Sequence, residues 1–265
     1  MADKSLITPD DFRQIYDLFQ ASISRFDCGR KCAPLNGGEP VCCSTQHAVP
    51  VVQRVEWELL KNRTDMWRRF KPYDRATRQI VKEIGSSCAA VECRGARHCE
   101  RDNRSLACRA FPFFPYIDRA GKFIGLAYYW DFEDRCWVIS NMQIVEAEFL
   151  KDFVKAFELL FERDPEEYDN FKSHSASMRR VFSRRRKAIA FIGREGGFFE
   201  ERPHGGGIRA IAPEKLPKFG PYKSERAYER ALKEAQAEAA PEQHHPDPHP
   251  VGDPARASAE APSMP

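Results

Sequence analysis

The placement of cysteines constrains this chain more than any other feature of its sequence. All nine cysteines of the 265-residue protein lie between residues 28 and 136, and eight of them fall into two short polar segments. The first group is Cys28, Cys32, Cys42 and Cys43, the second is Cys88, Cys93, Cys99 and Cys108, and Cys136 stands apart. Four thiolates fill a tetrahedral zinc site or hold an iron–sulfur cluster. We therefore expect both segments to be loops around metal, in one centre or two.

The redox state of these thiols depends on the compartment. The first residues, MADKSLITPDDF, are acidic and lack the apolar stretch of a secretory signal. No apolar run approaches the roughly 20 residues that span a bilayer. These features predict a cytoplasmic protein without membrane contact, where dense cysteine usage indicates metal or redox chemistry rather than disulfides. The alternative is that some cysteines are small buried apolar residues.

Cationic residues are interleaved with both groups of cysteines. Those within the groups or beside them are Arg30, Lys31, Arg94, Arg97, Arg101, Arg104 and Arg109. Cations near thiols lower their pKa values and favour the thiolate form that binds metal, although a solvated basic surface is the other interpretation. His47 and His98 lie close to cysteines and are alternative ligands. In an extended segment, adjacent Cys42 and Cys43 would point to opposite faces. They would then serve two metal positions, or one would bind metal while the other packs beneath it.

Helix signals are clear in the N-terminal half. Thr8 is suited to cap a helix whose first residue is Pro9, and an apolar stripe follows. Further helices are predicted over residues 50–62 and 74–84, and a cysteine-rich loop over residues 88–109.

Strand signals follow the second group of cysteines. In FFPYIDRAGKFIGLAYYWDF, aromatic and apolar arms surround the turn residues Asp118 to Gly121, which predicts a β-hairpin. A further strand is predicted for CWVIS, which carries Cys136. From residue 142 the periodicity becomes helical, with an interruption at Pro165.

These signals together predict an α+β protein. A small cysteine-cluster domain with helices and a β-hairpin is expected over residues 1–144, and a helical region over residues 145–225. Residues 226–265 are rich in Ala, Glu, Pro and His, a composition that predicts a disordered tail.

Two further stretches are candidates for binding anions. The basic run RRVFSRRRK, residues 179–187, could contact nucleic acid because clustered arginines neutralise phosphates. A formal net charge of only +3 argues against this partner, and a solvated helix face is the preferred interpretation of the run. Glycines 205–207 are a candidate for phosphate or carboxylate binding, or a flexible turn. The sequence offers no argument for a catalytic triad or a paired-carboxylate site.

The second cysteine segment resembles a known family. The run CERDNRSLACRAFPFFP is similar to the second motif of the YkgJ-type cysteine-cluster family, described as zinc- or iron-chelating domains. That motif is matched here by Cys99, Arg104, Ser105, Cys108, Arg109, Phe111 and Pro112. The family's first motif, C-x₂-C-x₂-C-C, resembles Cys28, Cys32, Cys42 and Cys43, with the spacing stretched to C-x₃-C-x₉-C-C. Either Cys88 or Cys93 matches the cysteine upstream of the second motif, and Arg-Ser replaces the family's Arg-Pro.

This resemblance implies a metal-binding protein, with zinc and a [4Fe–4S] cluster both open. All nine cysteines are candidate ligands. One related group, the flagellin lysine N-methylases, implies a cluster-dependent enzyme that modifies a partner protein as an alternative. The third hypothesis is a zinc-stabilised nucleic-acid-binding module.

Overall fold

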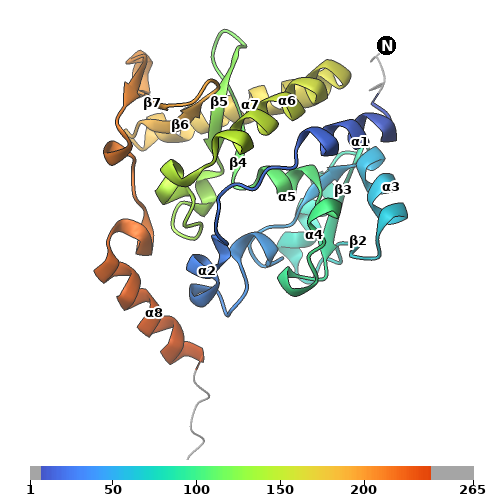
Figure 1. Cartoon of the computed structure of the whole chain (residues 1–265), viewed down its shortest axis with the longest axis horizontal. Coiled ribbons are helices and arrows are strands. Elements are labelled where there is room, and N and C mark those ends of the chain that lie inside the picture. The colour runs from blue at the N-terminus through green and yellow to red at the C-terminus, as the bar shows by residue number, and fades with distance from the viewer. Residues whose placement is uncertain (1–6, 240–265) are drawn as a thin grey trace, which may run out of the picture.

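The computed structural model of the chain describes residues 7–239, which form an α+β fold (Figure 1). The helices are α1 (Pro9–Leu18), α2 (Gly29–Cys32), α3 (Arg54–Arg63), α4 (Arg75–Glu83), α5 (Leu106–Ala110), α6 (Ala147–Arg163), α7 (Pro165–Arg184) and α8 (Glu225–Ala239). The strands are β1 (Val51–Gln53), β2 (Trp67–Arg69), β3 (Cys88–Cys93), β4 (Phe113–Ile117), β5 (Phe123–Tyr128), β6 (Ile189–Gly193), β7 (Phe198–Glu201) and β8 (Ile208–Ile211). No helix within residues 7–239 combines the length and the apolar character needed to cross a membrane.

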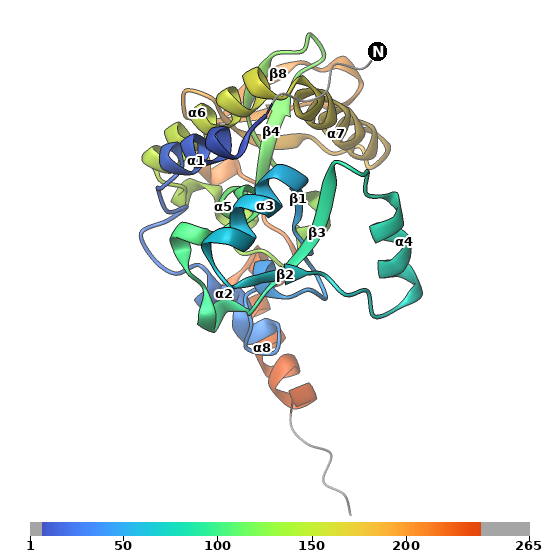
Figure 2. The same cartoon turned by 90° about the vertical axis from the view of Figure 1, so that its right-hand side faces the viewer.

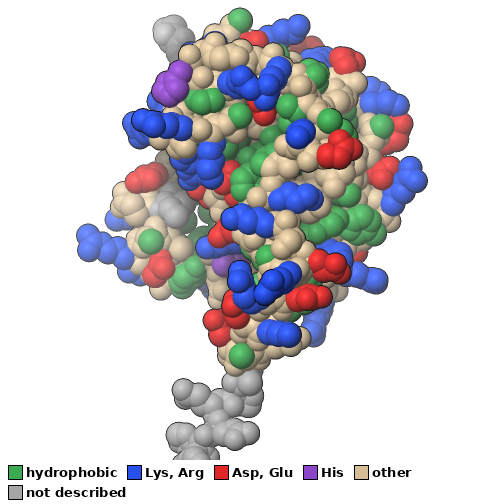
Figure 3. All heavy atoms as spheres, turned by 90° about the vertical axis from the view of Figure 1, so that its left-hand side faces the viewer, with side chains coloured by type: hydrophobic (Ala, Val, Ile, Leu, Met, Phe, Trp, Pro, Cys, Tyr) green, Lys and Arg blue, Asp and Glu red, His purple; other side chains and the backbone are tan. Residues whose placement is uncertain are grey.

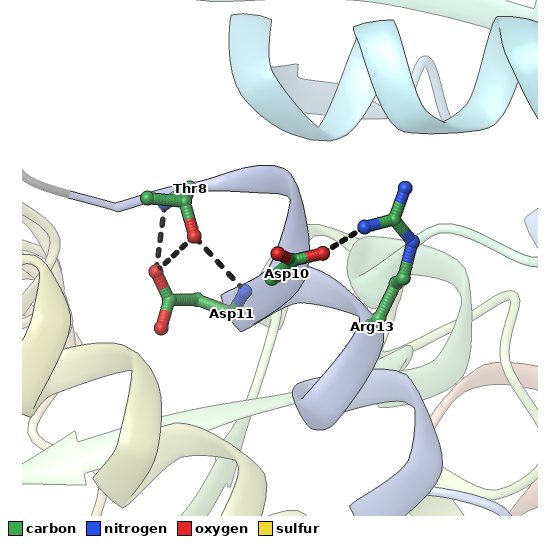
Figure 4. Close-up of polar contacts among 4 residues, drawn as sticks. All are labelled: Thr8, Asp10, Asp11 and Arg13. Atoms are coloured by element: carbon green, nitrogen blue, oxygen red, sulfur yellow. Dashed lines mark hydrogen bonds and ion pairs between the residues drawn. The ribbon is translucent and has the colours of Figure 1, made fainter.

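A capping box begins α1 and confirms the predicted N-cap (Figure 4). The hydroxyl oxygen of Thr8 accepts a hydrogen bond from the backbone N–H of Asp11 at 3.3 Å, and the Asp11 carboxylate accepts one from the N–H of Thr8 at 2.8 Å. The Thr8 hydroxyl also donates to this carboxylate at 2.6 Å, and that bond is the main cause of a lowered pKa for Asp11. In the same turn, Arg13 pairs with Asp10.

A small antiparallel sheet of order β1-β3-β2 occupies the N-terminal half. The helix expected from residue 50 begins only at Arg54, because the β-branched residues Val51 and Val52 pair with β3 instead. The expectation of a loop over residues 88–109 was wrong for β3 and α5. The centre of β3 is apolar and buried, and partners on both of its edges satisfy its backbone groups.

The larger antiparallel sheet has the order β4-β5-β6-β7-β8. Its first two strands confirm the predicted hairpin, with Phe113 paired to Tyr128 and a turn closed by the N–H of Asp118 on the carbonyl of Lys122 at 2.9 Å. Residues 145–225 supply α6 and α7, as expected, but they also supply β6 to β8. The run IAFIG forms β6, where all five residues are buried, so it adds a strand to the hairpin.

The strand predicted for CWVIS was wrong. The backbone N–H groups of this segment bond locally, that of Cys136 to the carbonyl of Phe132 at 2.9 Å and that of Ile139 to Cys136 at 3.2 Å. A 3-10 segment follows over Ile139–Ile144. Because these donors are already satisfied by nearby carbonyls, they do not pair with a neighbouring strand.

Residues on both sides of position 144 share one apolar core. The ring of Phe19, which ends α1, lies 5.3 Å from Phe149 and 5.9 Å from Phe153, both on α6. This packing fixes the direction in which the chain leaves α1 towards the first group of cysteines.

Helix α8 lies at one end of the molecule beside α2 (Figures 1 and 2). Disorder was expected from residue 226, and this was wrong for residues 226–239, which belong to α8. Ala, Glu, Lys and Arg are strong helix formers, and Tyr228 attaches the helix by donating to the carbonyl of Lys31 at 2.9 Å. The remainder of the expected tail, residues 240–265, lies outside the described residues.

Candidate metal centre

Eight of the nine cysteines lie within electrostatic reach of at least one other thiol. This eight-thiol group consists of Cys28, Cys32, Cys42, Cys43, Cys93, Cys99, Cys108 and Cys136. Every member lies close enough to another for its negative charge to act on the pKa of that neighbour. The group therefore joins three parts of the chain that are far apart in sequence.

The first cysteine segment folds into short helical turns. Cys28 directly precedes α2 and Cys32 ends it. Cys42 and Cys43 lie in a 3-10 turn, Val41–Cys43, which places their Sγ atoms 3.9 Å apart. The expectation that these two thiols point to opposite faces was wrong, because the segment is helical rather than extended. Both thiols can therefore contribute to the same centre.

The second segment contributes Cys93, Cys99 and Cys108 from three different elements. Cys93 ends β3, and its Sγ accepts a hydrogen bond from the N–H of Gly95 at 3.4 Å. The chain reverses here because Gly95 has a φ of 89°, a conformation that favours glycine. Cys108 lies in α5, whose N-cap Ser105 accepts the N–H of Cys108 at 3.2 Å.

Cys136, which stands apart in the sequence, joins the group. Its side chain is only 7% exposed, and burial is the main cause of its raised pKa. The thiols of Cys28 and Cys32 raise this pKa further, so Cys136 faces the first segment. The thiol of Cys136 is positioned by the turn that forms in place of the expected strand.

Cys88 lies apart from the other eight. It is at the opposite end of β3 from Cys93, and five residues of strand span roughly 16 Å. The charges that act on its thiol are those of Glu167, Glu166 and Asp164. This geometry leaves Cys88 outside the centre.

Arg104 is the cation in contact with the group. Its Nε donates to the Sγ of Cys99 at 3.0 Å, and its charge lowers the pKa values of Cys43 and Cys108. Other interleaved arginines have different partners. Arg109 donates to backbone carbonyls and Arg94 pairs with Asp65 at 2.9 Å, so the sequence pattern overstated the number of cations near sulfur.

Burial keeps most of these thiols protonated when no metal is bound. It raises the pKa of Cys28 to about 11 and that of Cys108 to about 12. Cys43 is an exception, because a hydrogen bond from Cys42 lowers its pKa and raises that of Cys42. Several buried thiolates side by side therefore require a cation, and metal binding here would release protons.

Neither candidate histidine is free to point into the group. The Nε2 of His47 is 2.6 Å from the Asn36 side-chain oxygen, and its Nδ1 is 2.8 Å from Arg135. His98 is exposed. Glu39, between Gly38 and Pro40 in the first cysteine segment, was not among the predicted site residues, although its charge acts on the pKa of Cys43.

A cavity of about 480 Å³ reaches the group from the side of α8. Cys32 and His47 line one wall, and Tyr222, Ala227 and Ala231 line the other. The space is large enough for a small molecule or a single side chain of a partner protein.

The two candidate anion-binding stretches lie on the surface. In the basic run, Arg179 donates to the carbonyl of Ile117 at 2.7 Å and Arg185 pairs with Glu133 at 3.6 Å, while Arg184, Arg186 and Lys187 are exposed. Figure 3 shows basic side chains mixed with acidic and apolar ones over the face that carries β7 and α8. Glycines 205–207 lie in the turn between β7 and β8. Nucleic-acid binding stays a prediction.

The thiols are close together but do not form a closed coordination sphere. Within residues 7–239, no three side chains of His, Cys, Asp or Glu are placed to hold a metal ion together. Comparison of the chain with protein families, with curated proteins and with solved structures gave no match.

Proposed function

We propose that this is a metal-binding cysteine-cluster protein whose eight-thiol group holds an iron–sulfur cluster, of the [4Fe–4S] type, or zinc. The observation that carries the proposal is the gathering of eight thiols from three distant segments around Arg104. Thiols are soft ligands that suit both metals, and two of the eight are buried while the other six are half-buried. The resemblance to the YkgJ-type family supports the same conclusion.

The group offers eight thiols, twice the four that one tetrahedral zinc ion or one [4Fe–4S] cluster binds. It therefore suffices for one centre with spare thiols or for two centres. A cluster would supply electron transfer or a Lewis-acidic iron, whereas zinc would supply structural stability. Side chains must move into ligating positions when metal binds, since no coordination sphere is formed in the described residues. We place the protein in a reducing cytoplasm, where these thiols stay free to bind metal.

The test is metal analysis of protein purified without oxygen. We expect stoichiometric iron and sulfide with the broad visible absorption of a cluster, or stoichiometric zinc in colourless protein. Colourless protein that contains neither iron nor zinc would contradict the proposal. Restoring metal to chelated protein then checks that binding is reversible.

A second candidate function is a cluster-dependent enzyme that modifies a partner protein. The cavity beside Cys32 and His47 favours it, because its lining includes one thiol of the group. In cells lacking the wild-type chain, the variant Cys108→Ser should fail to restore function, whereas Cys88→Ser should restore it. Full function of Cys108→Ser would contradict this candidate.

A further inference from the structure

Glu39 carries an unusual carboxylate in the first cysteine segment. Its Oε2 atom is buried and has no hydrogen-bond partner among the described residues. A carboxylate oxygen that loses water without gaining a donor destabilises the folded chain. Such an atom therefore indicates a missing positive partner.

The surroundings of this oxygen belong to the eight-thiol group. The carboxylate lies close enough to Cys43 for its charge to act on that thiol. A Cβ atom placed on Gly95 would lie 4.0 Å from the Oε2 of Glu39, and the N–H of Gly95 donates to the Sγ of Cys93. The unpartnered oxygen thus lies where the first and second cysteine segments meet.

Protein cations do not supply the missing partner. No ion pair of Glu39 is formed within residues 7–239. Arg104, the cation of the group, directs its Nε at Cys99. A metal ion held by the neighbouring thiols would satisfy the oxygen.

We propose that Glu39 is an oxygen ligand of the metal centre, which would make it a mixed sulfur–oxygen site. This inference rests on the proposed metal-binding function. Carboxylate oxygen is a harder ligand than thiolate and suits iron or zinc less well than sulfur does. The metal position held by Glu39 is therefore the one that exchanges first with external ligands and chelators.

The test compares Glu39→Gln with a matched control, Glu100→Gln. Glu100 follows Cys99 in sequence, but its carboxylate is exposed and already accepts from Thr64 at 2.7 Å and Asn103 at 2.6 Å. Metal-loaded, anaerobically prepared proteins are mixed with EDTA, and the loss of iron and zinc is followed over time. Glu39→Gln should lose metal about 10-fold faster than wild type or carry less metal at the start. Glu100→Gln should match wild type.

Thermal unfolding with and without metal distinguishes a role of Glu39 as a metal ligand from a role in packing. Without metal, Glu39→Gln should have a higher Tm than wild type, because it removes the charge from a carboxylate whose Oε2 atom is buried without a partner. With metal, its Tm should be lower. A lower Tm in both states, or metal loss equal to wild type, would contradict the role of Glu39 and leave the proposed centre intact. Wild-type protein without iron or zinc would contradict both.

Discussion

At the residue scale, two cysteines of the same sequence segment have different surroundings. Cys108 is half-buried among other thiols with Arg104 nearby, whereas Cys88 lies beside carboxylates at the far end of β3. Sequence spacing placed both in one group, because it does not reveal that β3 separates Cys88 from the rest.

We predict that Cys108→Ser and Cys88→Ser differ in metal content. Replacing Cys108 removes a sulfur from the centre, so this variant should lose most of its iron or zinc. Cys88→Ser should keep the wild-type stoichiometry. Metal analysis of both variants, purified in parallel without oxygen, checks the prediction, and equal losses would count against it.

Arg104 should contribute to metal affinity through its bond to Cys99. Loss of an outer partner of a metal ligand typically costs about 10-fold or more in affinity. We therefore expect Arg104→Gln to weaken binding by about 10-fold in a competition with a chelator. Arg94→Gln is the matched control, because Arg94 pairs with exposed Asp65. Equal affinity of the two variants would show that Arg104 plays no part.

At the scale of elements, buried Glu56 of α3 connects two helices to the centre. Its Oε1 accepts the hydroxyl of Tyr16 from α1 and the N–H of Leu106 from α5, each at 2.6 Å. Because α5 carries Cys108, the carboxyl group of Glu56 holds in place a helix that contributes to the eight-thiol group. Burial raises the pKa of Glu56 to about 7 from an ordinary value of 4.5.

This raised pKa predicts a pH-dependent stability. Between pH 4.5 and 7 the folded chain holds a proton on Glu56 that the unfolded chain has lost, so the contribution to stability falls as pH rises. Relative to Glu56→Gln, the free energy of unfolding of wild type should fall by up to about 3 kcal/mol across this interval. Urea unfolding of chelated proteins at several pH values measures the difference. Parallel pH curves would contradict the prediction.

The capping box of α1 makes a separate contribution. Thr8→Ala leaves the N–H of Asp11 without its side-chain acceptor. We expect a loss of about 1 kcal/mol in the free energy of unfolding. Asp10→Ala, which removes only the exposed pair with Arg13, should cost less in the same urea titration. A cost from Thr8→Ala no larger than that of the control would argue against the cap.

At the scale of the whole molecule, the centre depends on contacts that only the folded chain makes. The N-cap at Thr8, the hairpin after Pro112 and the helices after residue 145 follow from local signals, and the sequence predicted them. The strand that carries Cys88 away depends on pairing with distant segments. The turn that carries Cys136 is closed by local hydrogen bonds, and the apolar run CWVIS does not reveal it because a buried strand has the same composition. Helix α8 was missed because its Ala- and Glu-rich composition suits both a solvated tail and a helix.

The most direct test of a single centre is thiol labelling, mapped to individual cysteines by mass spectrometry. Metal-loaded protein is alkylated under anaerobic conditions before and after removal of the metal. We expect labelling of the eight-thiol group to rise on metal removal, whereas Cys88 should react equally in both states. Protection of Cys88 by the metal would contradict a single centre formed by the eight-thiol group. Labelling of the other eight cysteines that is the same with and without metal would contradict it as well.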